Sequence, residues 1–245
     1  MVRFAQAAVL EKIGHPLSIR SIQIPILKKG QVLIKVHYSG VCRSQLMEIH
    51  GGRGEDKWLP HLLGHEGSGV VESIGADVTK VSKGDEVILG WIKGLGFDAA
   101  GAVYNSSEKK INSGSVTTFS NYTIVSENRL VKKPSWVPFD EAVLFGCALP
   151  TGGGMALHNF NKNHEIVTII GLGGIGLSAL LTLKELGATK IIAVDTIKNT
   201  REMALNHGAN ICLDPTTSDF AYEYKKYAPL GCDLCIEAGG SVNTI

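Results

Sequence analysis

Three residues with metal-binding side chains stand out, although they lie far apart in the sequence. They are Cys42 in GVCRS, His65 in GHEGSG and Cys147 in FGCALPTG. Zinc prefers thiolate and imidazole ligands, and a catalytic zinc site uses three protein ligands and leaves one position open. An isolated cysteine or histidine is more often a buried packing residue than a ligand, so the spacing alone does not establish a metal site.

A second candidate site is the glycine-rich turn GLGGIG, which follows an apolar stretch and precedes a helical pattern. In a dinucleotide-binding turn, Gly171 would permit the tight turn, Gly173 would let the backbone approach the pyrophosphate, and Gly176 would allow close helix–strand packing. The start of the following helix offers free N–H groups to the phosphates. Asp195 ends the next strand, 19 residues after Gly176, where a carboxylate accepts hydrogen bonds from ribose hydroxyls and repels a 2′-phosphate. The pattern predicts binding of NAD in preference to NADP.

The first half of the chain, which must position the three metal-binding residues, has the pattern of β-strands and loops. Short alternating or β-branched segments are separated by turn signals. Residues 93–118 are rich in Gly, Ser and Asn and predict a surface loop. The expected strands are Ala5–Leu10, Leu17–Ile24, Gln31–Tyr38, Ser68–Ile74, Glu86–Leu89 and Phe119–Val125, and the expected short helices are Ser44–His50 and Phe139–Phe145.

The character of the sequence changes near residue 150, where compact apolar strands begin to alternate with helical stretches. This alternation predicts a parallel, doubly wound sheet. We therefore expect two domains, residues 1–150 and 151–245, with the boundary near Leu149–Gly152. The expected strands are Ile166–Ile170, Lys190–Val194, Ile211–Leu213 and Asp233–Glu237, and the expected helices are Ile175–Leu186, Asn199–His207 and Asp219–Lys226.

The composition excludes several classes of protein. A 245-residue chain with 44% hydrophobic residues and a net charge of +1 suits a globular α/β protein. The lysine pairs are scattered and form no broad basic patch, so nucleic acid is not an expected partner. The longest uncharged run, Ile166–Leu183, contains four glycines and predicts strand, turn and helix, not a membrane span. The N-terminus lacks a secretory pattern, and the five scattered cysteines favour a reducing cytoplasm.

The motifs together resemble one protein family. GHEGSGVVESIGADV followed by KGDEVI is similar to the zinc-site signature of the medium-chain alcohol dehydrogenases. GVCRS, FGCALPTG and GLGGIG with Asp195 occur in that family's order, and TTFSNYTIV resembles its strand before the domain crossover. The resemblance runs from residue 5 to the end, broken only at the loop. It implies an α/β protein with a GroES-like, partly open β-barrel followed by a Rossmann doubly wound sheet.

The resemblance also implies site residues. Cys42, His65 and Cys147 match the ligands of one catalytic zinc, Glu66 matches a carboxylate that can act as a transient ligand, and Ser44 matches the hydroxyl that receives the substrate proton. The implied reaction moves hydride between an alcohol or polyol and NAD, giving an aldehyde or ketone. The residues implied to contact NAD are Arg43, Thr151, Gly171, Gly173, Gly174, Gly176, Asp195 and Lys198.

Three positions depart from the family's pattern. The four cysteines of a structural zinc lobe are missing near residues 93–110, so one zinc is expected. Gln45 stands where many members have an aspartate that orients the zinc-binding histidine; it can accept a hydrogen bond but brings no charge. Met47 replaces a relay histidine, which leaves water or His50 to release the proton.

Two further features of the sequence each allow two interpretations. Trp91 falls where the family often places a pocket-lining side chain, and an aromatic residue in the barrel core is an equal alternative. Cys232 and Cys235 flank a predicted strand, whose alternation places them on opposite faces, which favours buried thiols over a functional pair.

The end of the sequence, GGSVNTI, follows directly after the fourth predicted strand of the nucleotide domain. Family members continue with two more strands, a dimer-forming edge and a return segment, so we expect a piece of a longer protein whose full-length form is a homo-oligomer. The alternatives are a zinc-free quinone or enoyl reductase of the same superfamily and a non-catalytic nucleotide-binding fragment. The sequence does not name the substrate.

Overall fold

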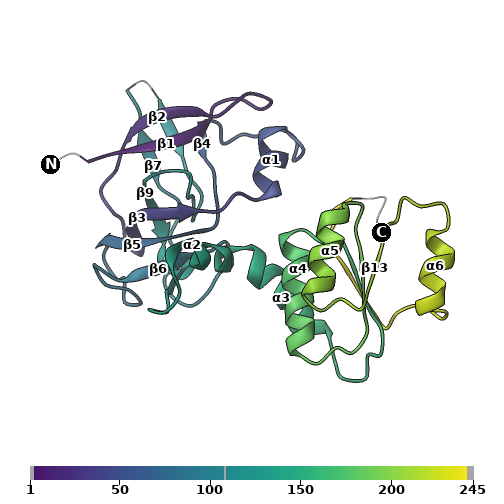
Figure 1. Cartoon of the computed structure of the whole chain (residues 1–245). Coiled ribbons are helices and arrows are strands. Elements are labelled where there is room, and N and C mark those ends of the chain that lie inside the picture. Colours follow the sequence, from purple (N-terminus) through teal and green to yellow (C-terminus); the bar gives the residue numbers. More distant parts are fainter. Residues whose placement is uncertain (1–2, 108, 242–245) are drawn as a thin grey trace. The chain divides into compact units, whose positions relative to one another are not determined.

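The computed structural model describes residues 3–107 and 109–241, and the chain divides into two compact units, one ending at Cys147 and one beginning at Ala148 (Figure 1). The first unit combines a closed β-barrel, with strand order β1-β2-β7-β8-β4, and a five-stranded sheet, with order β10-β6-β5-β3-β9. The barrel strands are β1 (Phe4–Leu10), β2 (Ser18–Gln23), β4 (His61–Leu62), β7 (Val103–Asn105) and β8 (Lys110–Asn112). The sheet strands are β3 (Gln31–Ser39), β5 (Gly67–Ile74), β6 (Glu86–Leu89), β9 (Tyr122–Ser126) and β10 (Leu130–Lys132).

Strand β3 contributes to two hydrophobic cores of this unit, because successive side chains of a strand point to opposite faces. Val32 and Ile34 pack in the core of the five-stranded sheet, and Leu33 packs in the core of the barrel. The short helices of the unit are α1 (Arg43–Ile49) and α2 (Phe139–Ala142), with the 3-10 turns η1 (Glu127–Arg129) and η2 (Val143–Gly146).

Residues 93–118 differ from the expected loop, because they contain the hairpin β7–β8. The sequence is too polar to indicate two strands, but the buried side chains of Tyr104 and Ile111 fix them in the barrel core. The Tyr104 hydroxyl accepts the Ile124 main-chain N–H at 2.7 Å, and burial raises the pKa of Tyr104 to about 12.

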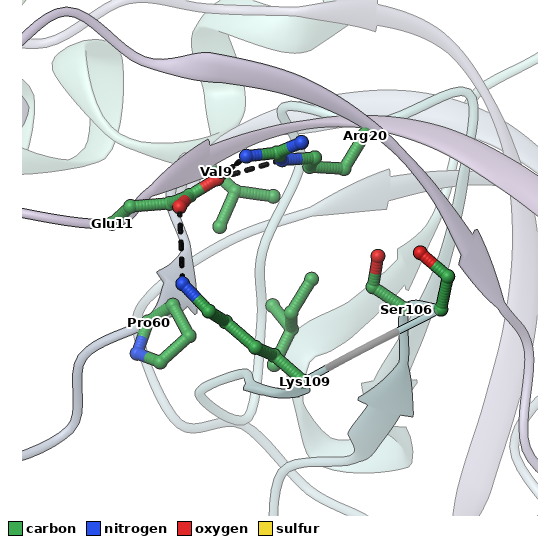
Figure 2. Close-up of a pocket in the computed structure, with 8 residues that line it drawn as sticks. Val9, Glu11, Arg20, Pro60, Ser106 and Lys109 are labelled. Carbon is green, nitrogen blue, oxygen red and sulfur yellow. Dashed lines mark hydrogen bonds and ion pairs between the residues drawn. The ribbon is translucent and has the colours of Figure 1, made fainter.

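Ionic contacts tie this hairpin to the first strands of the barrel. Figure 2 shows the Glu11 carboxylate between Arg20 of β2 and Lys109 of the hairpin, at a small cavity. Glu11 Oε1 lies 2.6 Å from Arg20 Nε, and Glu11 Oε2 lies 3.6 Å from Lys109 Nζ. The hydrogen bond from Arg20 holds the pKa of Glu11 below its usual value, so this carboxylate is ionised at neutral pH.

A buried carboxylate organises the loops of the first unit near residues 79–97. Glu127 is 1% exposed; its Oε1 accepts the main-chain N–H groups of Thr79 and Lys80, and its Oε2 accepts that of Phe97, each at 2.6 Å. Burial raises the pKa of Glu127, but these three N–H donors outweigh burial and leave the pKa below its usual value. One charged side chain thereby cross-links two loops without cysteines.

The second unit is a parallel sheet with strand order β13-β12-β11-β14, as the alternating pattern predicts. Helices α3, α4 and α5 cover one face and α6 covers the other (Figure 1). Alternation along β12 explains the two faces: Ile191 and Ala193 pack in one core, and Ile192 and Val194 in the other. The strands are β11 (Val167–Ile170), β12 (Ile191–Val194), β13 (Ile211–Leu213) and β14 (Leu234–Glu237), and the helices are α3 (Ala148–Asn159), α4 (Gly174–Glu185), α5 (Lys198–Asn206) and α6 (Phe220–Tyr227).

Helix α3 does not follow from its sequence, ALPTGGGMALHN, which contains three glycines and a proline. Its glycines permit close packing on α4: a Cβ added to Gly152 would lie 2.0 Å from the Ile175 carbonyl oxygen. Tertiary packing therefore outweighs the low helix propensity of glycine. In the described part of the chain, no helix is long and apolar enough to cross a membrane.

Candidate metal and nucleotide sites

The first unit brings the three predicted metal ligands together from three separate segments. Cys42 follows β3 and is the N-cap of α1, His65 lies between β4 and β5, and Cys147 ends the 3-10 turn η2. One ligand atom of each lies within 4.8 Å of the other two. These distances suit three ligands of a single metal ion.

The environment of His65 fits a metal ligand. The ring is half-buried, and its Nδ1 lies 2.5 Å from Gln45 Nε2 and 3.5 Å from Ser44 Oγ. Its Nε2 is buried and has no hydrogen-bond partner among the described residues. Burial, followed by the positive charge of Arg53, lowers the pKa of His65, which favours the neutral ring that zinc requires. Two thiols and this imidazole nitrogen therefore form a donor set suitable for zinc.

The Gln45 side chain does not accept a hydrogen bond from His65, contrary to the expectation from the sequence. It is 3% exposed, and its Oε1 accepts the main-chain N–H of Cys42 at 2.8 Å. The amide nitrogen, and not the oxygen, consequently faces His65. The expectation that Gln45 accepts from His65 is wrong for this geometry, because the start of α1 already uses its oxygen.

The other residues implied around the metal take different positions. Glu66 is buried, and close backbone packing makes room for it: a Cβ on Gly40 would lie 2.7 Å from Glu66 Oε1. Ser44 is half-buried in the first turn of α1, and Arg43 beside it is exposed. Trp91 is 47% exposed, so the alternative of an aromatic residue in the barrel core is wrong.

A second group of potential ligands was not anticipated from the sequence. Glu48, Asp56 and His61 also place one ligand atom each within 4.8 Å of one another. His61 is buried; its Nε2 lies 2.7 Å from Asp56 Oδ2, and its Nδ1 lies 3.0 Å from the Leu62 carbonyl oxygen. Each ring nitrogen of His61 therefore has an oxygen partner without a metal. No local motif could have indicated this group, because α1, a loop and β4 each supply one member.

A cleft of about 580 Å³ connects this group with the His65 region. Gln45 and His65 line one part of it, and Glu48, Asp56 and His61 line another. Cys42, Ser44 and Cys147 are not among its lining residues. The cleft therefore reaches His65 from the side on which Gln45 lies.

The glycine-rich turn of the second unit has the geometry that a dinucleotide site requires. Gly171 has a φ of +86°, which favours glycine, and a Cβ on Gly176 would lie 1.9 Å from the Gly171 carbonyl oxygen. A Cβ on Gly173 would meet no described atom within 4 Å, so the backbone there is open to a ligand. Helix α4 begins at Gly174 directly after this turn. The structure thus has the tight turn at Gly171, the open backbone at Gly173 and the close packing at Gly176, as the sequence predicts.

The remaining residues implied to contact NAD lie around this turn or beyond it. Asp195 follows β12; its Oδ2 accepts the Leu172 N–H at 2.7 Å and its Oδ1 accepts the Ile197 N–H at 2.8 Å. These bonds fix the carboxylate beside the turn. Thr151 lies on α3, and its buried hydroxyl has no hydrogen-bond partner among the described residues. Lys198 begins α5 and lies 3.7 Å from Glu202, largely exposed.

The two clustered cysteines of this unit differ from the expectation of buried thiols on opposite faces. Cys235 is exposed, and Cys232 precedes β14, so strand alternation does not separate the two thiols. Partial burial raises the pKa of Cys235, and the neighbouring Cys232 raises it further. Both effects favour the protonated thiol at Cys235.

Comparison with known proteins connects both units to one family. The model of the alcohol dehydrogenase GroES-like domain matches residues 28–135, and that of the zinc-binding dehydrogenase domain matches residues 174–245. An S-(hydroxymethyl)glutathione dehydrogenase from Photobacterium damsela subsp. piscicida is 32% identical, with 98% of this chain and 73% of that protein covered.

Solved structures agree with this relationship. An alcohol dehydrogenase zinc-binding domain protein from Burkholderia ambifaria has a TM-score of 0.89 at 25% identity and covers 100% of this chain and 73% of its own. Benzyl alcohol dehydrogenase from Acinetobacter calcoaceticus has a TM-score of 0.84 at 28% identity, with 98% and 72% covered. A GroES-like β-rich unit and a Rossmann-type parallel sheet occur here in the same chain order. The chain therefore belongs to the zinc-binding alcohol dehydrogenase family of the medium-chain dehydrogenase/reductase superfamily.

Proposed function

We propose that this oxidoreductase is an NAD-linked alcohol dehydrogenase that uses one zinc ion held by Cys42, His65 and Cys147. The observation that carries the proposal is the cluster of three donor atoms within 4.8 Å, together with a buried His65 Nε2 that has no hydrogen-bond partner among the described residues. An alcohol or polyol is the proposed substrate, and an aldehyde or ketone the product. The names of the relatives, which include a benzyl alcohol dehydrogenase, support this substrate class.

The chemistry divides between the bound groups and the chain. Cys42, His65 and Cys147 would hold the zinc ion, which would supply Lewis-acid chemistry, and the glycine-rich turn would hold NAD, which would supply hydride-transfer chemistry. Cys42 and Cys147 supply thiolates that temper the charge of the metal, and the Ser44 hydroxyl receives the proton of the substrate and passes it towards solvent. Ser44 Oγ lies 3.5 Å from His65 Nδ1, so this hydroxyl lies beside one of the proposed ligands.

The nucleotide preference rests on the second unit. The open backbone at Gly173 and the free N–H groups at the start of α4 suit a pyrophosphate. Asp195 is held beside this turn by two main-chain N–H groups, and its charge opposes a 2′-phosphate. We propose NAD, not NADP, as the cofactor.

The test is a joint measurement of metal content and cofactor-dependent turnover. Metal-replete protein should contain one zinc per chain and reduce NAD with a panel of primary, secondary and polyhydric alcohols. His65→Ala should lose both zinc and turnover, and His158→Ala, on α3, should retain zinc. Absence of zinc after metal-replete purification would instead favour the zinc-free quinone or enoyl reductases of the superfamily.

A further inference from the structure

The Gln45 side chain connects the start of helix α1 with the proposed metal ligand His65. Gln45 lies in the first turn of α1 and is 3% exposed. Its Oε1 accepts the Cys42 main-chain N–H at 2.8 Å, and its Nε2 lies 2.5 Å from His65 Nδ1. Both ends of one buried amide are therefore engaged.

The chemistry of the three groups fixes the direction of these bonds. A main-chain N–H can only donate, so the amide oxygen must face Cys42. The amide NH2 then faces His65, and it too can only donate. His65 Nδ1 must therefore be an acceptor without hydrogen, and the neutral ring carries its hydrogen on Nε2.

This arrangement conflicts with metal binding. Nδ1 is engaged by Gln45, so Nε2 is the ring atom left for a metal, and a ligating nitrogen cannot carry hydrogen. When Nε2 binds a metal, the neutral ring carries its hydrogen on Nδ1, which then points at the NH2 of Gln45. The Ser44 hydroxyl, 3.5 Å from Nδ1, is too distant to accept that hydrogen well.

We propose that Gln45 is a positioning residue that holds metal-free His65 in the Nε2–H form, and that metal binding requires the Gln45 amide to turn over. After the turn, the amide oxygen accepts from Nδ1–H and the Cys42 N–H loses its acceptor. In the exchange a proton leaves Nε2 and another binds Nδ1, so the ring stays neutral. The Cys42 N–H at the start of α1 and the metal-bound form of His65 thus compete for one oxygen atom.

A carboxylate at position 45 removes this competition, because its two oxygens can accept from the Cys42 N–H and from Nδ1–H at the same time. Gln45→Glu is nearly isosteric and is the direct test. Leu46→Glu is the matched control: it adds the same charge to the same helix at a side chain that is 49% exposed. It separates the effect of the hydrogen bond from that of the charge.

The first measurement is Zn2+ affinity, by competition with a chromophoric chelator. Loss of a hydrogen-bond partner behind a metal ligand costs about 10- to 100-fold in metal affinity, so Gln45→Glu should gain about that factor. Leu46→Glu should stay within about threefold of the wild type, as expected for a screened surface charge. Equal affinities for the wild type and Gln45→Glu would overturn the proposal.

The second measurement needs no metal. Long-range 15N–1H NMR of histidine-labelled, metal-free protein identifies which ring nitrogen of His65 carries hydrogen, with the His65→Gln variant as the assignment control. We expect Nε2–H in the wild type and Nδ1–H in Gln45→Glu; Nδ1–H in the wild type would refute the inference. The affinity measurement rests on the proposed metal site, whereas the tautomer does not. Zn2+ binding by neither protein would refute the metal site, while the tautomer would still decide the role of Gln45.

Discussion

The two proposed sites of this protein are built in opposite ways. The glycine-rich turn lies within one strand–turn–helix segment, β11 to α4, and its geometry comes from backbone conformation. The metal-ligand cluster collects Cys42, His65 and Cys147 from three segments across the whole first unit. The turn comes from one short segment, with Asp195 bonded to it, whereas the cluster needs the barrel and sheet to be complete. Substitutions in the glycine-rich turn should therefore act through local backbone geometry. Substitutions in the metal-ligand cluster should act by removing a ligand side chain.

The strongest test of this contrast removes one member of the cluster. Cys147→Ala should weaken Zn2+ binding by at least about a thousandfold, since zinc binding contributes about 4 kcal/mol per ligand. Chelator competition measures the affinity, and Cys212→Ala, a half-buried thiol of the second unit, is the control. Unchanged affinity in Cys147→Ala would mean that the three donors do not hold one ion.

Within the glycine-rich turn, two substitutions separate folding from binding. Gly176→Ala should lower the free energy of unfolding by about 3 kcal/mol or more, because its Cβ would lie 1.9 Å from a carbonyl oxygen. Gly173→Ala should change stability by less than about 1 kcal/mol, because its Cβ meets no described atom within 4 Å.

Calorimetry measures the stability of these two variants, and titration with NAD measures their cofactor affinity. Gly173→Ala should still lose at least about tenfold in NAD affinity, since the added methyl occupies the space the pyrophosphate needs. Normal NAD binding by Gly173→Ala would argue that the cofactor does not approach this turn.

The loops of the first unit depend on a charge, which pH can probe. Glu127→Gln should destabilise the protein by about 1–3 kcal/mol at neutral pH, because an amide cannot accept all three N–H groups. The lowered pKa means that the carboxylate stabilises the fold above the ordinary value of 4.5 and loses this effect as pH falls through the folded-state pKa.

Urea unfolding between pH 3 and 7 checks this sign. The difference between wild type and Glu127→Gln should shrink in acid, whereas Glu55→Gln, at an exposed side chain, should show little difference throughout. A difference that is constant with pH would show that the charge of Glu127 does not matter.

The smallest expected effect concerns nucleotide choice. Asp195→Asn removes the charge but keeps one acceptor for the N–H groups of Leu172 and Ile197. The preference for NAD over NADP should fall by about tenfold, or about 1.4 kcal/mol. Parallel titrations of both nucleotides measure it; tighter NADP binding by the unaltered protein would contradict the role given to Asp195.

Elements with regular patterns could be predicted from the sequence. The four strands of the second unit, their parallel arrangement and the geometry of its three turn glycines follow from alternation, periodicity and spacing. Irregular elements could not be predicted from the sequence. Helix α3 forms despite its glycines because they fit against α4, and the β7–β8 hairpin forms in a polar segment because Tyr104 and Ile111 fill the barrel.

The sequence by itself determined which residues we propose for the chemistry: the thiols, the imidazole, the glycines and Asp195, since residue type and local spacing indicate these. Only the tertiary structure decided which other groups contact these and further polar side chains. It engages the oxygen of Gln45 at the start of α1, places Glu127 between two loops, and brings Glu48, Asp56 and His61 together. The physical reason is that a buried polar atom needs a hydrogen-bond partner, and the folded chain decides which neighbours, near or far in the sequence, supply it.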